Sequence, residues 1–244
     1  MSKSSHYLNS FLKNLTLQTP LAIIIGSILI SLSIILQGYI IRGKIPQTAT
    51  NQTFFQGRPI DTTDHIEGNT ASGVVVVEYS DPECPYCIQL HPTMKKLRTD
   101  YGDKIAFVYR TFPLTQIHPH AYDESRAITC AGIVGGTKGF YTYIDSLFGY
   151  KVSNKTTELP TTGKEDIAKG SNLDIQKFKD CMQSTTPGEL VDASTNDGIT
   201  AGVSGTPTTF ILRKKNNTYE VVAMVSGAQS YSYFKAAIDQ ALSK

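Results

Sequence analysis

The chain has 244 residues, of which 40% are hydrophobic and 18% are charged. This composition is typical of a folded globular protein and excludes a disordered chain. Lysines and arginines number 23 against 21 aspartates and glutamates, a balance without the basic face that nucleic-acid binding requires, so we expect no nucleic-acid partner. The four cysteines are too few for a small scaffold held together by many disulfides.

A long apolar run near the amino end predicts a membrane anchor. A short basic tail occupies residues 1–20, and the uncharged run extends over residues 21–41. About 20 apolar residues are what a helix needs to cross a membrane, whereas the apolar part of a cleaved signal peptide has about 7 to 15. We therefore expect a single transmembrane helix at 21–41, with a buried core helix or a signal peptide as alternatives. Basic residues on both sides leave its orientation open.

Residues 42–72 form a polar segment that is rich in threonine, glycine and proline and has no helical or strand periodicity. Such a composition is typical of a linker. We expect a linker whose end could pack onto the domain, and we expect the folded domain itself to occupy 73–244.

The domain begins with a strand, a helix and a second strand. A nearly continuous β-branched run at Val74–Tyr79 predicts a strand that is buried on both faces. A helix is expected from Cys84 to about Asp100, and a strand at Lys104–Phe112. A connection of this length makes the unit a parallel crossover.

Helical periodicity then dominates residues 118–202, which predicts an all-helical insertion. Two apolar faces mark it: Phe140, Tyr143, Ile144, Leu147 and Phe148 form one, and Ile175, Phe178, Cys181 and Met182 form the other. Strands at Thr208–Arg213 and Glu220–Val225, joined by a polar turn, predict a hairpin. A final helix is marked by Phe234, Ile238 and Leu242.

Cys84 and Cys87 form a C-x-x-C pair directly after the first strand, at the first turn of the helix. The amide groups and dipole of a helix N-terminus favour a thiolate, and the thiolate is the form that attacks disulfides. Cys87, one turn later, can close a ring with Cys84. We therefore expect Cys84 to be the nucleophile and the more exposed thiol, and Cys87 to be the resolving thiol.

Half of a zinc site is the alternative reading of this pair. A zinc site needs a second ligand pair at short spacing, but Cys130 and Cys181 are 51 residues apart. His91, His118 and His120 are available as ligands, although positions on a helix surface or in a loop are the simpler expectation. We expect no bound metal or other cofactor.

Five segments resemble the DsbA-like thioredoxin-fold thiol-disulfide oxidoreductases of bacterial envelopes. They are VVEYSDPECPYC, HPTMKKL, YGDKIAFVYRTFPL, IHPHA and GVSGTPTTFIL, and the resemblance covers about residues 61–243. It implies an α/β thioredoxin fold, in which a central mixed sheet is flanked by helices and carries the all-helical insertion at about 118–202. It also implies that the domain folds outside the cytoplasm, on the extracytoplasmic side of the cytoplasmic membrane.

Two further sites are carried over from this resemblance. Pro207, preceded by Thr206, matches the family's cis-proline, which leaves the backbone of the preceding residue free to pair with a substrate strand; an ordinary trans proline is the alternative. Glu78, six residues before Cys84, matches the buried acid that exchanges a proton with Cys87. Its alternative is a surface glutamate at a strand edge.

The residues around the cysteines leave the direction of exchange open. Pro85-Tyr86 is also the dipeptide of glutaredoxins and differs from the Pro-His of the strongest oxidants in the family, and these positions help to set the reduction potential. A glutaredoxin proper lacks an anchor and a long insertion. Glu83 would oppose ionisation of the neighbouring Cys84, and we expect solvent to screen it.

The leading hypothesis is a membrane-tethered thiol oxidase that introduces disulfides into reduced secreted or envelope proteins. A membrane quinone-linked partner, similar to DsbB or VKOR, would reoxidise it. A reductase or isomerase in the same compartment is the first alternative. A tethered substrate-binding module without turnover is the second, and the intact C-x-x-C and Thr-Pro sequences argue against it.

Cys130 and Cys181 both fall in helical stretches of the insertion, and thiols brought close together in an oxidising compartment usually join. A cysteine pair in the insertion is also implied by the resemblance. We therefore expect a structural disulfide that stays oxidised when the active site is reduced. Closure of a loop of about 50 residues would stabilise the domain by roughly 4 kcal/mol. Two buried free cysteines are the alternative.

Overall fold

The structure is a computed structural model that describes residues 54–69 and 71–243. The expected tail, the anchor at 21–41 and the first part of the linker lie outside these residues. Within the described ranges, no helix has the length and apolar character needed to cross a membrane.

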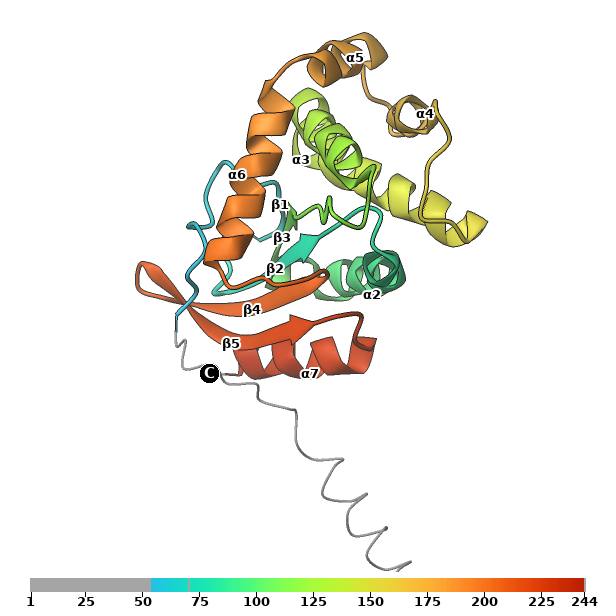
Figure 1. Ribbon diagram of the computed structural model, residues 1–244. Helices are drawn as coiled ribbons and strands as arrows, with labels where there is room; N and C mark the ends of the chain where they lie inside the picture. Colours follow the sequence, from blue (N-terminus) through green and yellow to red (C-terminus); the bar gives the residue numbers. More distant parts are fainter. Residues whose placement is uncertain (1–53, 70, 244) are drawn as a thin grey trace, which may run out of the picture. The chain divides into compact units, whose positions relative to one another are not determined.

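A five-stranded mixed sheet forms the centre of the domain, with the strand order β1-β3-β2-β4-β5 (Figure 1). Its strands are β1 (Ile66–Gly68), β2 (Val74–Ser80), β3 (Ala106–Thr111), β4 (Thr208–Lys215) and β5 (Thr218–Ser226). β2 is parallel to β3 and antiparallel to β4, while β1 and β5 form the antiparallel edges. All seven residues of β2 are buried, as the continuous β-branched run predicts.

Helices cover both faces of this sheet. α2 (Pro85–Tyr101) and α7 (Tyr231–Leu242) pack on one face, where Val76, Leu97 and Phe234 belong to one buried cluster. The opposite face buries Tyr79 and Phe210 against the end of α6 (Thr186–Thr200) and the residues that follow it. Ala241, rather than the predicted Leu242, completes the buried face of the last helix, and Leu242 is 42% exposed. A short 3-10 turn, η1 (Gly102–Lys104), leads from α2 to β3.

The insertion consists of α3 (Ala121–Asn154), α4 (Gly163–Gly170), α5 (Ile175–Gln183) and α6. In Figure 1, α4 and α5 lie at the top, and the lower end of α6 reaches the level of the strands. α3 changes direction at Gly136, whose φ of 61° is a conformation that favours glycine. The predicted apolar faces meet: Tyr143 of α3 stacks on Phe178 of α5 at a centroid distance of 5.7 Å. The insertion therefore has a core of its own, which continues to Cys84 and Cys87.

The linker predicted at 42–72 was expected to pack onto the domain at its end, and the described residues show that this packing begins as early as Phe54. Ile66 in β1 pairs with Val108, and Phe54 forms a bridge with Glu220. Asp64 is buried, and it binds Arg110 at 2.8 Å. A strand of three residues is too short to show an alternation of apolar and polar side chains. In a sequence, an acidic residue with a buried partner cannot be told from a solvent-exposed one. The polarity of this segment therefore reflects buried ion pairing as well as exposure.

Candidate active site

Asp81 shapes the loop that presents the cysteines. Its carboxylate accepts hydrogen bonds from the backbone N–H of Glu83 at 2.7 Å and of Cys84 at 3.2 Å. The same carboxylate binds the Leu114 N–H at 2.7 Å and lies 2.8 Å from Nδ1 of His118. Asp81 therefore joins the start of α2 to the β3–α3 connection. The sequence analysis did not single out Asp81, because its contacts with Leu114 and His118, 33 and 37 residues away, leave no local signal.

The two thiols of the C-x-x-C pair occupy different environments. Cys84 precedes the first residue of α2, and its Sγ lies 3.4 Å from the Thr206 carbonyl oxygen. Cys87 is fully buried, and the Asp81 N–H donates to its Sγ at 3.4 Å. Cys84 is 4% exposed, which makes it only slightly the more accessible of the two.

These environments separate the acidities of the thiols. The hydrogen bond from Cys87, assisted by Thr206 and by the backbone N–H groups of the first helical turn, lowers the pKa of Cys84 to about 6. Burial, together with the neighbouring Cys84, raises the pKa of Cys87 well above its usual value. At neutral pH the pair therefore holds one thiolate, on Cys84, and one thiol, on Cys87.

The Thr206–Pro207 segment lies against Cys84, although 122 residues separate Thr206 from it. Thr208 begins β4, which pairs with β2, so the sheet brings this segment to the end of the strand that carries the cysteines. The Thr206–Pro207 peptide bond is cis. The Thr206 hydroxyl is buried and has no other hydrogen-bond partner among the described residues, which leaves it available to a thiolate.

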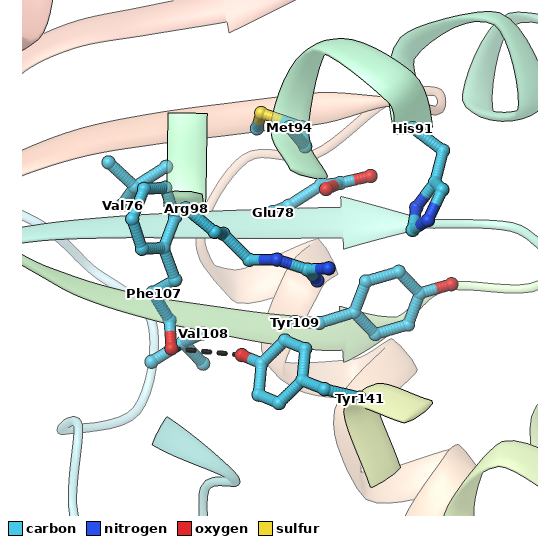
Figure 2. Close-up of a pocket in the computed structure, with 9 residues that line it drawn as sticks. All are labelled: Val76, Glu78, His91, Met94, Arg98, Phe107, Val108, Tyr109 and Tyr141. Atoms are coloured by element: carbon cyan, nitrogen blue, oxygen red, sulfur yellow. Dashed lines mark hydrogen bonds between the residues drawn. The ribbon is translucent and has the colours of Figure 1, made fainter. Parts of the chain in front are cut away.

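Glu78 is buried beneath the cysteines, so the alternative of a surface glutamate is wrong. It lies on β2 next to Tyr109 of β3 and lines a cavity of about 20 Å³. Figure 2 shows its carboxyl group directed toward His91, with Tyr109 beside them. Burial raises the pKa of Glu78 to about 7, although Ser80 and Arg98 act in the opposite direction.

Glu83 does not face solvent, which corrects the expectation that water screens it. Its side chain is buried and accepts a hydrogen bond from the His120 N–H at 2.6 Å. A compensating positive charge lies nearby, since the buried Lys151 ammonium donates to the Pro82 carbonyl at 3.0 Å and to the Glu124 carboxylate at 2.5 Å. The insertion therefore holds the loop in front of the cysteines by charged contacts.

Sequence reasoning missed Lys151 and Glu124. The signal was weak but present: Lys151 continues the helical spacing of Leu147 and Phe148, so it falls on the face that was predicted to be apolar. A charged residue at such a position indicates a buried partner.

His91, His118 and His120 do not come together as ligands of one zinc site. His91 is buried, not on a helix surface as expected, and stacks on Phe148 at 4.7 Å. His118 contacts Asp81, and His120 lies at the start of α3. In the part of the chain that the structure describes, there is no group of three or more side chains that could hold a metal ion.

A disulfide joins Cys130 of α3 to Cys181 of α5, with 5.8 Å between their Cα atoms. It crosses the core of the insertion, whereas Cys84 and Cys87 are free thiols. The four cysteines therefore form two separate pairs, and only the pair at the start of α2 is free to react.

Comparisons with known proteins bear on the family and the fold of this chain. A family model described as thioredoxin matches residues 61–240. The "Putative protein-disulfide oxidoreductase" of Rickettsia bellii is 31% identical over 208 residues, which are 83% of this chain and 73% of that protein. The crystal structure of alpha-DsbA1 from Wolbachia pipientis superposes with a TM-score of 0.64 at 20% identity, covering 76% of this chain and 94% of that one, which supports the fold.

Larger proteins contain a similar region. The Na(+)/H(+) antiporter NhaA 1 of Salinispora arenicola is 30% identical over 174 residues, which are 70% of this chain but 25% of the antiporter. The chain thus spans about a quarter of the length of the first such curated relatives. From the family model, which matches residues 61–240, the chain belongs to the thioredoxin family.

Proposed function

We propose that the chain is a membrane-tethered oxidase that transfers a Cys84–Cys87 disulfide to reduced secreted or envelope proteins. The pKa values of the two thiols support an oxidase over a reductase. The pKa of Cys84 is lowered to about 6, whereas that of Cys87 is raised. Stabilising a thiolate stabilises the reduced form of the pair, which makes its disulfide a stronger oxidant.

The reaction proceeds through a mixed disulfide. A substrate thiolate attacks Sγ of Cys84, the bond between Cys84 and Cys87 breaks, and Cys87 leaves with the electron pair and takes up a proton. The second substrate thiolate then attacks the substrate sulfur of the mixed disulfide and releases Cys84 as a thiolate. The substrate loses two electrons and the cysteine pair gains them. Because Cys84 stays ionised at neutral pH, one of the two substrate protons is released to solvent.

Two features beside Cys84 are suited to hold a substrate chain. The carbonyl of Thr206 lies 3.4 Å from the Cys84 sulfur, and in this proposal the backbone there pairs with an extended peptide, as in recognition by strand addition. The ring of Tyr86, between the cysteines, is 61% exposed and offers an apolar surface with a polar tip. Neither contact requires particular side chains in the substrate peptide, which suits an enzyme that acts on many reduced proteins.

Location and reoxidation belong to the same proposal. The apolar run at 21–41 would tether the domain to the cytoplasmic membrane on its extracytoplasmic side, and a quinone-linked membrane partner similar to DsbB or VKOR would restore the Cys84–Cys87 disulfide. The bridge between Cys130 and Cys181 supports an oxidising compartment.

The reduction potential of the full chain, measured in glutathione buffers, tests the direction. The pKa of about 6 at Cys84 lies between the values of about 7 in thioredoxin and about 3.5 in DsbA. We therefore expect a potential between about −270 mV and about −120 mV, the values of those two proteins. A potential of about −270 mV or lower would reject the oxidase and select the reductase.

A further inference from the structure

Polar side chains collect beneath Cys87, on the sheet face that α2 covers. Glu78 is paired in register with Tyr109 on one side and with Thr209 on the other, so the three side chains share this face. The hydroxyls of Tyr109, Thr209 and Ser80 are buried, and none has a hydrogen-bond partner of good geometry among the described residues. A polar cluster of this kind inside a core indicates a function, because unpartnered buried hydroxyls are destabilising.

Ser80 connects the resolving thiol to the buried acid. It lies two residues after Glu78 on β2 and is completely buried. It shares a face of β2 with Glu78 and directly precedes Asp81, whose N–H donates to the Cys87 Sγ at 3.4 Å. In this position its hydroxyl acts to lower the pKa of Glu78 and that of Cys87, against the larger effect of burial on each. A proton can thus pass between Cys87 and Glu78 by way of this hydroxyl. Glu78 itself is only 7% exposed, so its own exchange of that proton with solvent is restricted.

His91 lies beside Glu78 and contacts the partly exposed carboxylate of Asp145. It follows Cys87 by one helical turn, and it lines the same cavity of about 20 Å³ as Glu78 (Figure 2). A volume of this size can hold one water molecule. The Nε2 atom lies 3.0 Å from Oδ1 of Asp145, a contact whose geometry does not meet that of a hydrogen bond. The side chain of Asp145 is 22% exposed, whereas that of His91 is 7% exposed.

The charged surroundings suit a histidine that accepts and releases a proton. Burial lowers the pKa of His91, so the ring is neutral at rest. Asp145 remains an anion that can stabilise a transient imidazolium, because His91 and Arg98 lower its pKa despite burial. The titratable and charged groups that face this region from the packed elements are Glu78 of β2, Tyr109 of β3, Glu67 of β1, Tyr141 and Asp145 of α3, and Lys95 and Arg98 of α2.

We propose that His91 passes protons between solvent and Glu78 during disulfide exchange, an inference that rests on the proposed function. When the Cys84–Cys87 bond breaks, Cys87 leaves as a thiolate and receives a proton from Glu78 through Ser80. The Glu78 carboxylate is then protonated again by His91, which draws its proton from solvent beside Asp145. Formation of the disulfide reverses each transfer. His91 touches neither thiol and acts through Glu78.

The experiment follows single-turnover reduction of the oxidised full chain by dithiothreitol. The chain contains no tryptophan, so free thiols are quenched with a maleimide and counted by mass spectrometry. At pH 7 and above, where Glu78 must regain its proton, His91→Ala should react about 10-fold more slowly, less than the roughly 100-fold contribution of a general acid in direct contact. Added imidazole should restore the rate by occupying the space of the deleted ring.

His65→Ala is the matched control, because His65 also stacks on a phenylalanine, Phe140, at 4.3 Å but does not line the cavity. It should react at the unmodified rate with or without imidazole. His91→Gln retains a polar side chain of similar size that neither gains nor loses a proton near neutral pH, so it should be as slow as His91→Ala and insensitive to imidazole. This variant keeps the test decisive if His91→Ala fails to fold.

Two results would overturn the role of His91: an unmodified rate in His91→Gln, or a slow rate in a folded His91→Ala that imidazole does not restore. Either result leaves the proposed function intact as long as Cys84→Ser remains inactive in the same assay. An active Cys84→Ser would instead reject the proposed function itself.

Discussion

The two cysteine pairs of this chain show how surroundings decide what a thiol does. Cys130 and Cys181 lie in the helical core of the insertion and are joined to each other. Cys84 and Cys87 border the same core, yet both are free, and they lie at the end of a strand and the start of a helix. There, backbone N–H groups and Thr206 are available to stabilise a thiolate. A redox-active pair therefore requires donors aimed at one of its sulfur atoms, in addition to a neighbouring thiol.

The insertion and the loop that carries Cys84 are nevertheless in direct contact. Lys151 of α3 donates to the Pro82 carbonyl, just before Cys84, and is itself paired with Glu124 of the same helix. The insertion thus positions the loop that carries the reactive pair. The disulfide between α3 and α5 stabilises the helices that supply this contact, but it does not touch the reacting atoms.

The largest effect should follow from separating the two thiols of the reactive pair. Cys84→Ser should abolish exchange, because it removes the nucleophile. Cys87→Ser should instead accumulate mixed disulfides with substrate proteins, since the resolving thiol is lost while the Cys84 thiolate remains. Non-reducing electrophoresis followed by mass spectrometry of the trapped species measures both. Trapping through Cys87 in the Cys84→Ser variant would reverse the assignment of roles.

Removal of the bridge in the insertion should affect stability without affecting chemistry. The variant with Cys130→Ala and Cys181→Ala should lose roughly 4 kcal/mol of unfolding free energy, because the denatured chain regains the freedom of a loop of about 50 residues. Urea unfolding measures the loss. The exchange rate of the folded variant should remain within about twofold of the unmodified chain, and a much larger decrease would show that the bridge shapes the active site.

Much of this comparison was predictable from the sequence, because the patterns that carry it are local. The buried β-branched run at Val74–Tyr79, followed at once by C-x-x-C, predicted the strand and helix that the structure contains. The apolar faces of the insertion predicted the contact of α3 with α5. The cis bond before Pro207 and the Cys130–Cys181 bridge, both present in the structure, were expected from the family resemblance.

The contacts that tune the site were not predictable, because they join charged or polar residues far apart in the chain. Asp81 binds Leu114 and His118, Lys151 binds Glu124, and no sequence spacing encodes either choice. The burial of His91 was also missed. A polar residue on a helix is normally assigned to the surface, and only its position one turn after Cys87 pointed inward.

Glu78 allows the polar cluster under the reactive pair to be tested by its pH dependence. Its pKa is raised from 4.5 to about 7, so between these values the unfolded chain has released this proton while the folded chain retains it. The free energy of unfolding should therefore decrease as pH rises from about 4.5 to 7, by about 3 kcal/mol. Glu78→Gln lacks this loss and should be more stable than the unmodified chain at pH 8.

Urea unfolding of both reduced chains at pH 4 and pH 8 measures this difference, and the titration of Cys84 cancels in the comparison. Equal pH dependence of the two chains would mean that Glu78 is ionised in the folded state. Glu78 would then be unable to supply the proton that Cys87 takes up.

The smallest expected effect concerns the Thr206 hydroxyl. It is a hydrogen-bond donor beside Cys84, and the Cys130–Cys181 pair has no counterpart to it in this comparison. Alkylation of reduced protein by iodoacetamide should follow the ionisation of Cys84, with a midpoint near its pKa of about 6. Thr206→Val keeps the shape of the side chain but removes the hydrogen bond to the thiolate. Loss of about 1 to 1.5 kcal/mol of thiolate stabilisation would raise the midpoint by about one pH unit.

Thr209→Val provides the control for this measurement, because Thr209 lies three residues away, also has a buried hydroxyl, and is paired with Glu78 instead of lying beside Cys84. Its midpoint should stay that of the unmodified chain. If both variants left the midpoint unchanged, stabilisation of the Cys84 thiolate would have to come from Cys87 and the helix N–H groups alone. Contact with the Thr206–Pro207 segment would then serve substrate binding and have no part in the acidity of the nucleophile.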